Sequence, residues 1–206
     1  MAVMQTPKGT AYWARLFRPD TKFDADGVYS VKFRLPKADA SDVVQAIDTA
    51  MNVSLKKAKD ENPTKKGSIK AANPPYSDVY DNDGNETGEV EFNFKQKAVI
   101  KTRRGPMEKK PAVFDAKGKP ITDAVDVGNG STIKVAYEAF PYYTSMAGAG
   151  VSLRLVASQL INLQASGNDF SFGVEDGYEF SESDVKQSDE IFTDEEDQEV
   201  EDTGDF

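Results

Sequence analysis

Hydrophobic and polar side chains alternate with a period of two along much of residues 10–163. The pattern is clearest in residues 28–35, where the odd-numbered positions are apolar and positions 30, 32 and 34 hold Ser30, Lys32 and Arg34. Side chains of a β-strand point alternately to its two faces, so this run predicts a strand with one core face and one cationic face. We therefore expect a small, mostly antiparallel β-domain with five or more strands.

Further strands and turns follow from the same pattern. Residues 90–100, 133–137 and 151–163 also alternate and are predicted as strands. Gly118 and the Gly128-Asn129-Gly130 sequence can supply positive φ angles at two predicted reversals. Residues 146–150, in which Ala and Gly alternate, lack the spacing of a dinucleotide-binding fingerprint and are expected to form a flexible loop between strands.

A single helix is predicted at residues 39–60, because apolar residues recur there at steps of three and four. Asp39, Ser41 and Asp42 favour its start, where a side-chain cap and negative charge are stabilising, and lysines occupy its last turns. Pro63 ends the helix, and the stretch from there to Gly88 is expected to be a long loop.

One helix inserted after two strands favours a five-stranded antiparallel Greek-key barrel, and the OB-fold is the commonest barrel of this kind that binds single strands. An SH3-like barrel and a β-sandwich are the alternatives. We assign residues 1–164 to an OB-fold domain that binds single-stranded DNA. Residues 165–206 are assigned to a disordered acidic tail, because the apolar periodicity stops there.

The net charge of -10 conceals a division of charge along the chain. Residues 165–206 carry sixteen Asp and Glu and one Lys, a net charge of -15, whereas residues 1–164 have a net charge of +5. A basic body of this kind suits a nucleic-acid partner, and the acidic tail suits a competitor for the same surface. Tethering gives the tail an effective concentration of about millimolar there, which suffices to compete with weak DNA binding.

The sequence has no Cys and no His, which excludes disulfides, thiolate nucleophiles, histidine acid–base catalysis and the softest metal ligands. It also has no phosphate-cradling motif, so we expect neither an enzyme nor a cofactor. A nuclease with Mg²⁺ on Asp81, Asp83 and Glu86 is a weaker alternative, since these residues suit a turn-rich loop better. Without a membrane-spanning apolar run or a signal peptide, the protein is expected to be cytoplasmic.

Cationic side chains opposite the core faces are the candidate phosphate ligands, although such charges often only keep a face solvated. Interleaved aromatic residues favour DNA, because bases stack on exposed rings whatever the sequence; core packing of at least one of these rings is the alternative. We predict DNA contacts from Tyr12, Trp13, Arg15, Lys32, Arg34, Lys95, Lys97, Lys101, Arg103, Arg104, Lys134, Tyr142, Tyr143 and Arg154. Residues 101–105, with Lys109 and Lys110, are expected to form either a mobile basic loop over phosphates or a solvated hairpin tip.

The acidic tail ends in an aromatic residue with a terminal carboxylate, which a basic pocket lined by aromatic rings can capture. The candidate partner-binding residues are Asp202, Asp205 and Phe206. The alternative function is a protein-interaction module, a DNA mimic or a chaperone for basic proteins, in which the tail is the active part and the barrel a scaffold.

Several segments, in order along the chain, resemble one known family, the single-stranded DNA-binding proteins of short-tailed phages of the T-seven type. They are Gly27-Val28-Tyr29-Ser30-Val31, Leu35-Pro36, Asp81-Asn82-Asp83-Gly84, Val113-Phe114-Asp115-Ala116-Lys117-Gly118-Lys119, Gly128-Asn129-Gly130-Ser131, Lys134-Val135-Ala136-Tyr137, Pro141-Tyr142 and Gly204-Asp205-Phe206. Each segment is weak evidence by itself, but their shared order and the chain terminus are specific.

The resemblance implies an OB-fold with an inserted helix, binding of single strands without sequence preference, and annealing of complementary strands. It implies that the tail docks the phage DNA polymerase and primase-helicase in the infected bacterial host, and that a homodimer exchanges tails between grooves. The family's groove tyrosine matches Tyr142 and a basic position matches Lys134, whereas a further family lysine is Ala136 here.

Overall fold

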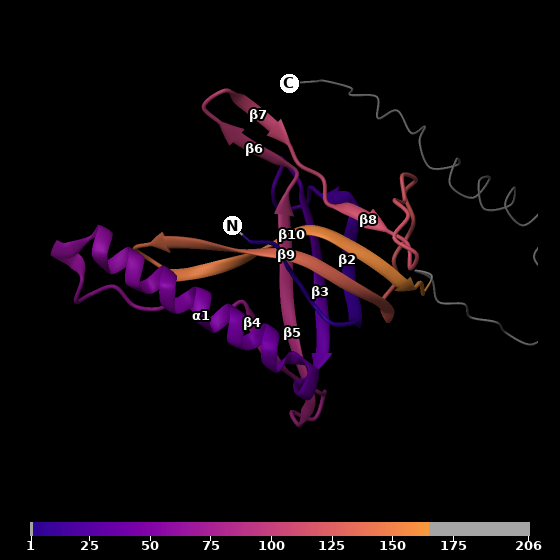
Figure 1. The fold of residues 1–206 in the computed structure, drawn as a ribbon, viewed down its shortest axis with the longest axis horizontal. Helices are drawn as coiled ribbons and strands as arrows, with labels where there is room; N and C mark the ends of the chain where they lie inside the picture. Colours follow the sequence, from indigo (N-terminus) through magenta and orange to yellow (C-terminus); the bar gives the residue numbers. More distant parts are fainter. Residues whose placement is uncertain (1, 165–206) are drawn as a thin grey trace, which may run out of the picture. The chain divides into compact units, whose positions relative to one another are not determined.

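The computed structural model describes residues 2–164, whereas Met1 and residues 165–206 lie outside the described part. Five strands form a closed ring in the order β2, β3, β5, β10, β9 and back to β2 (Figure 1). Their bounds are Gly9–Asp20 for β2, Val28–Pro36 for β3, Glu86–Lys97 for β5, Ser131–Thr144 for β9 and Gly148–Asn162 for β10. Neighbours in the ring are antiparallel except β5 and β10, which are parallel. This is the predicted OB-fold barrel, with its helix between the second and third ring strands.

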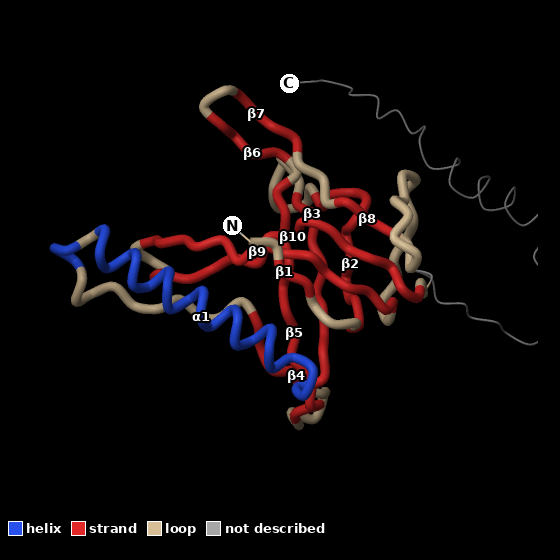
Figure 2. The backbone as a smooth tube through the Cα atoms, viewed as in Figure 1, coloured by secondary structure: helices blue, strands red, loops and turns tan. Residues whose placement is uncertain are grey.

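Shorter elements attach to the ring or project from it. Those attached are β1 (Met4–Gln5) beside β9, β4 (Tyr76–Tyr80) beside β5 and β8 (Ala112–Phe114) beside β10. Strands β6 (Val99–Thr102) and β7 (Gly105–Glu108) form a separate hairpin that extends away from the ring in Figure 2. The helix α1 spans Lys37–Glu61 and is followed by a 3₁₀ turn at Pro63–Lys65.

Four aromatic rings occupy the centre of the barrel. Phe33, Phe92 and Phe94 are fully buried, and Tyr137 is almost so. The centroid of the Phe94 ring lies 5.1 Å from that of Tyr137 and 6.0 Å from that of Phe33, separations at which tilted rings attract one another. Residues 28–35 alternate as predicted, with their odd-numbered side chains in this core.

Strands β9 and β10 continue beyond the ring as a long hairpin, residues 138–152, here called the arm. The arm lies along α1 (Figure 1). The Ser54 hydroxyl on the helix donates a buried hydrogen bond of 2.8 Å to the Gly150 carbonyl of the arm. Ala58, Ile69 and Ala149 form a second, smaller apolar cluster between the helix and the arm. These contacts hold the arm to the helix.

The prediction of a flexible loop at residues 146–150 is wrong. Only a short turn separates the strands, and β10 already begins at Gly148 in register with β9. The glycines allow close packing, because a Cβ on Gly148 would overlap the Lys70 carbonyl and one on Gly150 would lie 2.8 Å from the Ala72 Cβ. Backbone hydrogen bonds of Ala149 with Lys70 and Ala72, each 2.8–2.9 Å, join the arm to that segment.

Three other expectations need correction. The stretch from Pro63 to Gly88 is not a continuous loop, because it contains the 3₁₀ turn, β4 and the start of β5. The strand predicted at residues 90–100 breaks at Ala98, whose N–H donates instead to the Gly27 carbonyl at 2.8 Å. The helix begins two residues before Asp39, with Pro36 at its N-cap and no side-chain cap. The predicted disorder of the tail concerns residues outside the described part.

Candidate nucleic-acid interface

A groove of about 390 Å³ lies over the outer faces of β3, β5 and the arm, and the segment 73–77 borders it. Three of the predicted DNA-binding residues line it together: Lys32 from β3, Lys95 from β5 and Tyr142 from the arm. Lys95 has no ion pair within residues 2–164. The fold therefore brings two cations and an aromatic ring, distant in sequence, to one open surface.

The two tyrosines of the predicted Tyr142-Tyr143 pair lie on opposite faces of the arm. Tyr142 lies directly across from Gly150, and a Cβ added to that glycine would lie 3.0 Å from the tyrosine hydroxyl oxygen. The missing side chain thus leaves room for the ring. Tyr143 does not line the groove, and both tyrosines border a small pocket beside Lys57 and Glu61 of α1. Only Tyr142 belongs to the groove, as the period-two geometry of a strand requires.

Glu91 stands among the predicted cations and pairs with two of them. Its carboxylate oxygens accept hydrogen bonds from Lys32 Nζ at 2.8 Å and Arg34 Nε at 2.9 Å. Burial alone would raise the pKa of Glu91, but the hydrogen bonds from the two cations outweigh it, and the pKa is lowered. Arg34 also stacks on Tyr12, its guanidinium carbon 4.2 Å from the ring centroid. Glu91 stays ionised at neutral pH and cancels part of the charge that the sequence assigns to this face.

Arg154 is similarly engaged. Its guanidinium lies 3.7 Å from the Glu138 carboxylate and 4.0 Å from the centroid of the Phe140 ring. Both partners stand on β9, near the β10 position that carries Arg154. These two contacts hold the arginine in place, and its side chain is only about one-third exposed. Phe140 was missed in the sequence because its place diagonally across from Arg154, opposite Ser152, depends on strand register.

Trp13 occupies an unusual backbone position at a β-bulge. Tyr12 pairs with Lys32 and Arg15 with Ser30, so β2 contains one more residue than β3 in this interval. Trp13 has φ 51°, the only positive φ of a non-glycine residue in the described part of the chain. Bulges of this kind usually carry glycine in the left-handed position. The Trp13 ring is 68% exposed, so core packing does not explain it.

Asn129 holds this backbone conformation. The N–H of Trp13 donates to the Asn129 side-chain oxygen at 2.8 Å, across 116 residues of sequence. Asn129 belongs to the predicted Gly128-Asn129-Gly130 reversal, in which Gly130 adopts φ +91° as a turn of this kind requires. The reversal before β9 therefore also orients an exposed tryptophan on β2.

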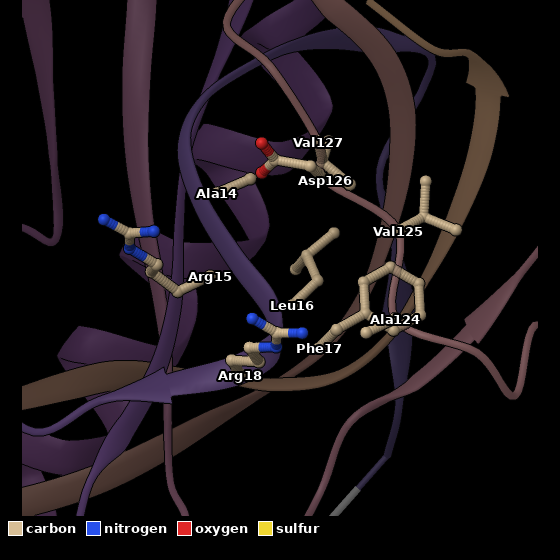
Figure 3. A pocket seen from close by; sticks show the side chains of 9 residues that line it. All are labelled: Ala14, Arg15, Leu16, Phe17, Arg18, Ala124, Val125, Asp126 and Val127. Atoms are coloured by element: carbon tan, nitrogen blue, oxygen red, sulfur yellow. The ribbon is translucent and has the colours of Figure 1, made fainter. Parts of the chain in front are cut away.

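Arg15 lies apart from the groove. It lines a pocket of about 360 Å³ between residues 14–18 of β2 and residues 124–127 (Figure 3). Arg18 and Asp126 line the same pocket. Arg18 was missed in the sequence analysis, because beyond the bulge the alternation of β2 is lost and Leu16 and Phe17 are both buried.

The segment predicted as a basic loop or a hairpin tip forms the β6–β7 hairpin. Arg103 and Arg104 form its turn, closed by a hydrogen bond of 2.8 Å from the Thr102 hydroxyl to the Gly105 carbonyl. Lys97 ends β5 just before the hairpin and pairs with Asp24 at 3.2 Å, and Lys101 on β6 pairs with Asp26 at 3.3 Å. The hairpin contributes a cluster of cations beyond the end of β5.

Lys134 does not line the groove. It borders a separate hollow of about 170 Å³ with Phe114 and Gln159. The predicted cations therefore lie in the groove, the β2 pocket, the basic hairpin and this hollow, except Arg34 and Arg154, which are held by Glu91 and Glu138.

Two of the three carboxylates of the alternative Mg²⁺ site, those of Asp81 and Glu86, have structural partners. Asp81 accepts backbone hydrogen bonds from Asp83 and Asn85 at 3.0 and 2.8 Å, and these bonds, that of Asn85 foremost, lower its pKa. Glu86 pairs with Lys37 at 2.7 Å. Residues 2–164 hold no cluster of three or more acidic groups suited to a metal ion. Within the same residues, α1 is too polar to cross a bilayer.

Comparison with known sequences gives one family. The family model described as the single-stranded DNA-binding protein of bacteriophage T7 matches residues 8–163. The single-stranded DNA-binding protein of Escherichia phage T7 is 29% identical over 198 residues, covering 87% of this chain and 85% of the relative. That of Enterobacteria phage T3 is 28% identical over 193 residues, covering 85% and 82%.

Comparison with solved structures agrees. The crystal structure of gp2.5, a single-stranded DNA-binding protein of bacteriophage T7, matches with a TM-score of 0.69 and 26% identity, covering 87% of this chain and 99% of gp2.5. The single-stranded DNA-binding protein of bacteriophage Enc34, in complex with single-stranded DNA, matches with a TM-score of 0.55 and 14% identity, covering 83% and 89%. The second match shows the shared fold alone.

Proposed function

The chain belongs to the family of the single-stranded DNA-binding protein of bacteriophage T7, and on that premise we propose that it binds single-stranded DNA without sequence preference. The family consists of binding proteins rather than enzymes, as the sequence predicts. The observation that carries the proposal is the groove in which Tyr142, Lys32 and Lys95 face the same open space. A polyanion with flat bases is the ligand that such a surface fits.

Tyr142 is the stacking platform and Lys95 the first phosphate ligand in this proposal, because its ammonium group has no competing ion pair in the described part of the chain. Lys32 and Arg34 contribute less, since Glu91 already neutralises part of their charge. Stacking and phosphate contacts read no base edges, which accounts for binding without sequence preference. The wider contact set proposed here is Tyr12, Trp13, Arg15, Lys97, Lys101, Arg103, Arg104, Lys134, Tyr143 and Arg154.

The two arm tyrosines provide the test. Tyr142→Ala should weaken binding of a fluorescent oligothymidine by about 1 to 3 kcal/mol, the contribution of one base–aromatic stack. Tyr143→Ala is the matched control, because it removes a neighbouring tyrosine from the opposite face of the arm and should change affinity less. Equal affinity of Tyr142→Ala and wild type, at unchanged thermal stability, would contradict the proposal.

Salt dependence tests the phosphate contacts. Each neutralised phosphate of a single strand contributes a slope of roughly -0.7 in a plot of log affinity against log salt. Lys95→Ala should therefore lower the magnitude of the slope by about that amount, whereas Tyr142→Ala should leave the slope unchanged.

We further propose that the tail competes with DNA for the groove and recruits replication proteins, namely the phage DNA polymerase and primase-helicase. Its net charge of -15 against +5 for residues 1–164 supports the competition. The proposed anchors are Asp202, Asp205 and Phe206. If the tail binds basic proteins and residues 1–164 bind no DNA, the alternative function is favoured, a protein-interaction module that acts through its tail.

The remaining parts of the proposal rest on family membership. The protein acts as a homodimer that coats and anneals complementary strands during replication, recombination and repair in the cytoplasm of the infected bacterium. Residues 1–164 supply the DNA-binding domain. Sedimentation velocity of the full chain, with and without oligonucleotide, tests the dimer; a monomer at micromolar concentration contradicts it.

A further inference from the structure

Phe23 presents an unpacked aromatic ring at the turn between β2 and β3. Its side chain is 89% exposed, the most exposed of any aromatic residue in the described part of the chain. Within residues 2–164 its ring contacts one charged group, the ammonium of Lys22, which lies 5.4 Å from the ring centroid. A phenyl ring with no polar atom and no packing partner has no evident role in stabilising the barrel.

The turn that carries Phe23 is closely hydrogen-bonded. The Lys22 N–H donates to the Asp20 carboxylate at 2.8 Å, and the Gly27 N–H donates to the Asp24 carbonyl at 2.8 Å. Gly27 completes the turn with φ +79°. These bonds fix the backbone on both sides of Phe23, so its exposure is not that of an unstructured loop.

Two ion pairs also hold the turn to the basic hairpin. Asp24 pairs with Lys97 at 3.2 Å and Asp26 with Lys101 at 3.3 Å. The hydrogen bond from Lys97 is the largest of several that lower the pKa of Asp24. Because its pKa is lowered, Asp24 keeps its charge and its pair with Lys97 at pH values below the ordinary carboxyl pKa.

The surroundings of Phe23 carry an excess of positive charge. Asp24 and Asp26 are matched by Lys97 and Lys101, and Asp20 is engaged by the turn itself. The cations beyond these pairs are Lys22 in the turn and Arg103, Arg104, Lys109 and Lys110 in or directly after the hairpin, against one further acid, Glu108. The ligand that suits an exposed ring beside such cations is again an anionic chain bearing flat bases.

Phe23 and Tyr142 lie at different heights along the direction of strand β5. Tyr142 pairs with Gly150, and the parallel register of β10 with β5 puts Gly150 level with Glu91. Phe23 lies beyond Lys97, which pairs with Val28 at the start of β3. Six residues of β5 separate these levels, about 20 Å at a strand rise of roughly 3.3 Å per residue.

We propose that Phe23 is a second base-stacking position for single-stranded DNA, separate from Tyr142 and flanked by the basic hairpin. The inference rests on the proposed DNA-binding function and extends it: the strand runs from the arm across β5 to the β2–β3 turn. A strand long enough to reach both rings gains from both, whereas a short one in the groove uses Tyr142 alone.

Titrations of the full-length protein with oligothymidines of about 4 and about 16 nucleotides, the range covered by single OB-folds, test the inference. Phe23→Ala should weaken binding of the long oligonucleotide by roughly 5- to 150-fold and leave the short one unchanged. Phe23→Trp, which keeps a ring, should retain wild-type affinity, and Phe23→Leu should behave like Phe23→Ala. Because the ring is uncharged, the salt slope should stay the same in all three variants.

Tyr80→Ala is the matched control, because Tyr80 is also an exposed aromatic residue, 56% exposed, but stands next to the acidic turn at Asp81. It should bind both oligonucleotides like wild type. The stacking position is overturned if Phe23→Ala binds the long oligonucleotide as tightly as wild type does. The same result for Phe23→Leu overturns it too. Failure of the wild-type protein to bind either oligonucleotide overturns the proposed function itself, which is a distinguishable result.

Discussion

Trp13 combines a left-handed backbone conformation with an exposed ring that is a proposed DNA contact. Trp13→Gly should remove the left-handed strain, so the free energy of unfolding should stay constant or rise by up to about 1 kcal/mol. The same change removes a ring that is 68% exposed, and should weaken binding of single-stranded DNA by about 1 to 3 kcal/mol. Urea denaturation and oligonucleotide titration of one protein sample measure both effects.

Asn129 supplies the control for this prediction. Asn129→Ala removes the acceptor of the Trp13 N–H and should lower the free energy of unfolding by about 0.5 to 1.5 kcal/mol. Asn129→Asp keeps an acceptor oxygen and should preserve stability. A Trp13→Gly variant that loses more than about 1 kcal/mol of stability would assign the indole to packing instead.

At the scale of elements, the arm depends on close approach between its strands, the helix and residues 70–72. Gly150→Ala should lower the free energy of unfolding by about 1 to 3 kcal/mol, because the new methyl group would lie 2.8 Å from the Ala72 Cβ. It should also weaken DNA binding, because the Tyr142 ring must move away from the added methyl group. Thermal melting and oligonucleotide titration test the two effects.

Gly67→Ala is the control for the arm, since nothing lies within 4 Å of the Cβ position there. It should leave stability and affinity close to wild type. A Gly150→Ala variant with normal stability and normal DNA binding would show that the ring does not need the space over this glycine.

At the scale of the whole molecule, the division of charge predicts self-competition. Deleting residues 186–206 removes ten acidic residues and one Lys. Affinity for single-stranded DNA should rise, and the gain should shrink as salt increases, because the tail's attraction to the basic body is screened. Fluorescence titrations of the full and truncated chains at low and high salt measure this.

A variant of full length in which those acidic residues become Asn and Gln separates charge from chain length. It should bind DNA like the truncated protein. Unchanged or weaker affinity after truncation contradicts self-competition while leaving the groove proposal intact, since the groove is tested by Tyr142→Ala.

Local sequence patterns predicted most of the barrel. The alternation in residues 28–35 and the spacing of apolar residues in the helix both report a periodicity that the backbone itself imposes, so they are legible without tertiary information. The prediction of a flexible loop at residues 146–150 was wrong because the conformation of this segment depends on tertiary contacts that the local pattern does not report. Its glycines resemble a flexible linker in sequence, and only the neighbouring segment 70–72 reveals that they permit close packing.

The sequence predicted which types of residue form the candidate site, but it did not predict which of them lie together in space. The resemblance predicted Tyr142 as a groove residue, and in the structure it lines the same groove as Lys32 and Lys95. Phe23 was missed, because a single phenylalanine in a turn gives no periodic signal. Its significance comes from exposure, which no local pattern reports.

The sequence by itself determined the strands, the single helix and the separation of a basic body from an acidic tail, because each depends on residues close together in the chain. Tertiary structure alone decided which cations are free. Glu91 meets Arg34 across 57 residues, and Asn129 meets Trp13 across 116. Such contacts depend on the register between strands, and a shift of one residue would send every side chain of a strand to its other face.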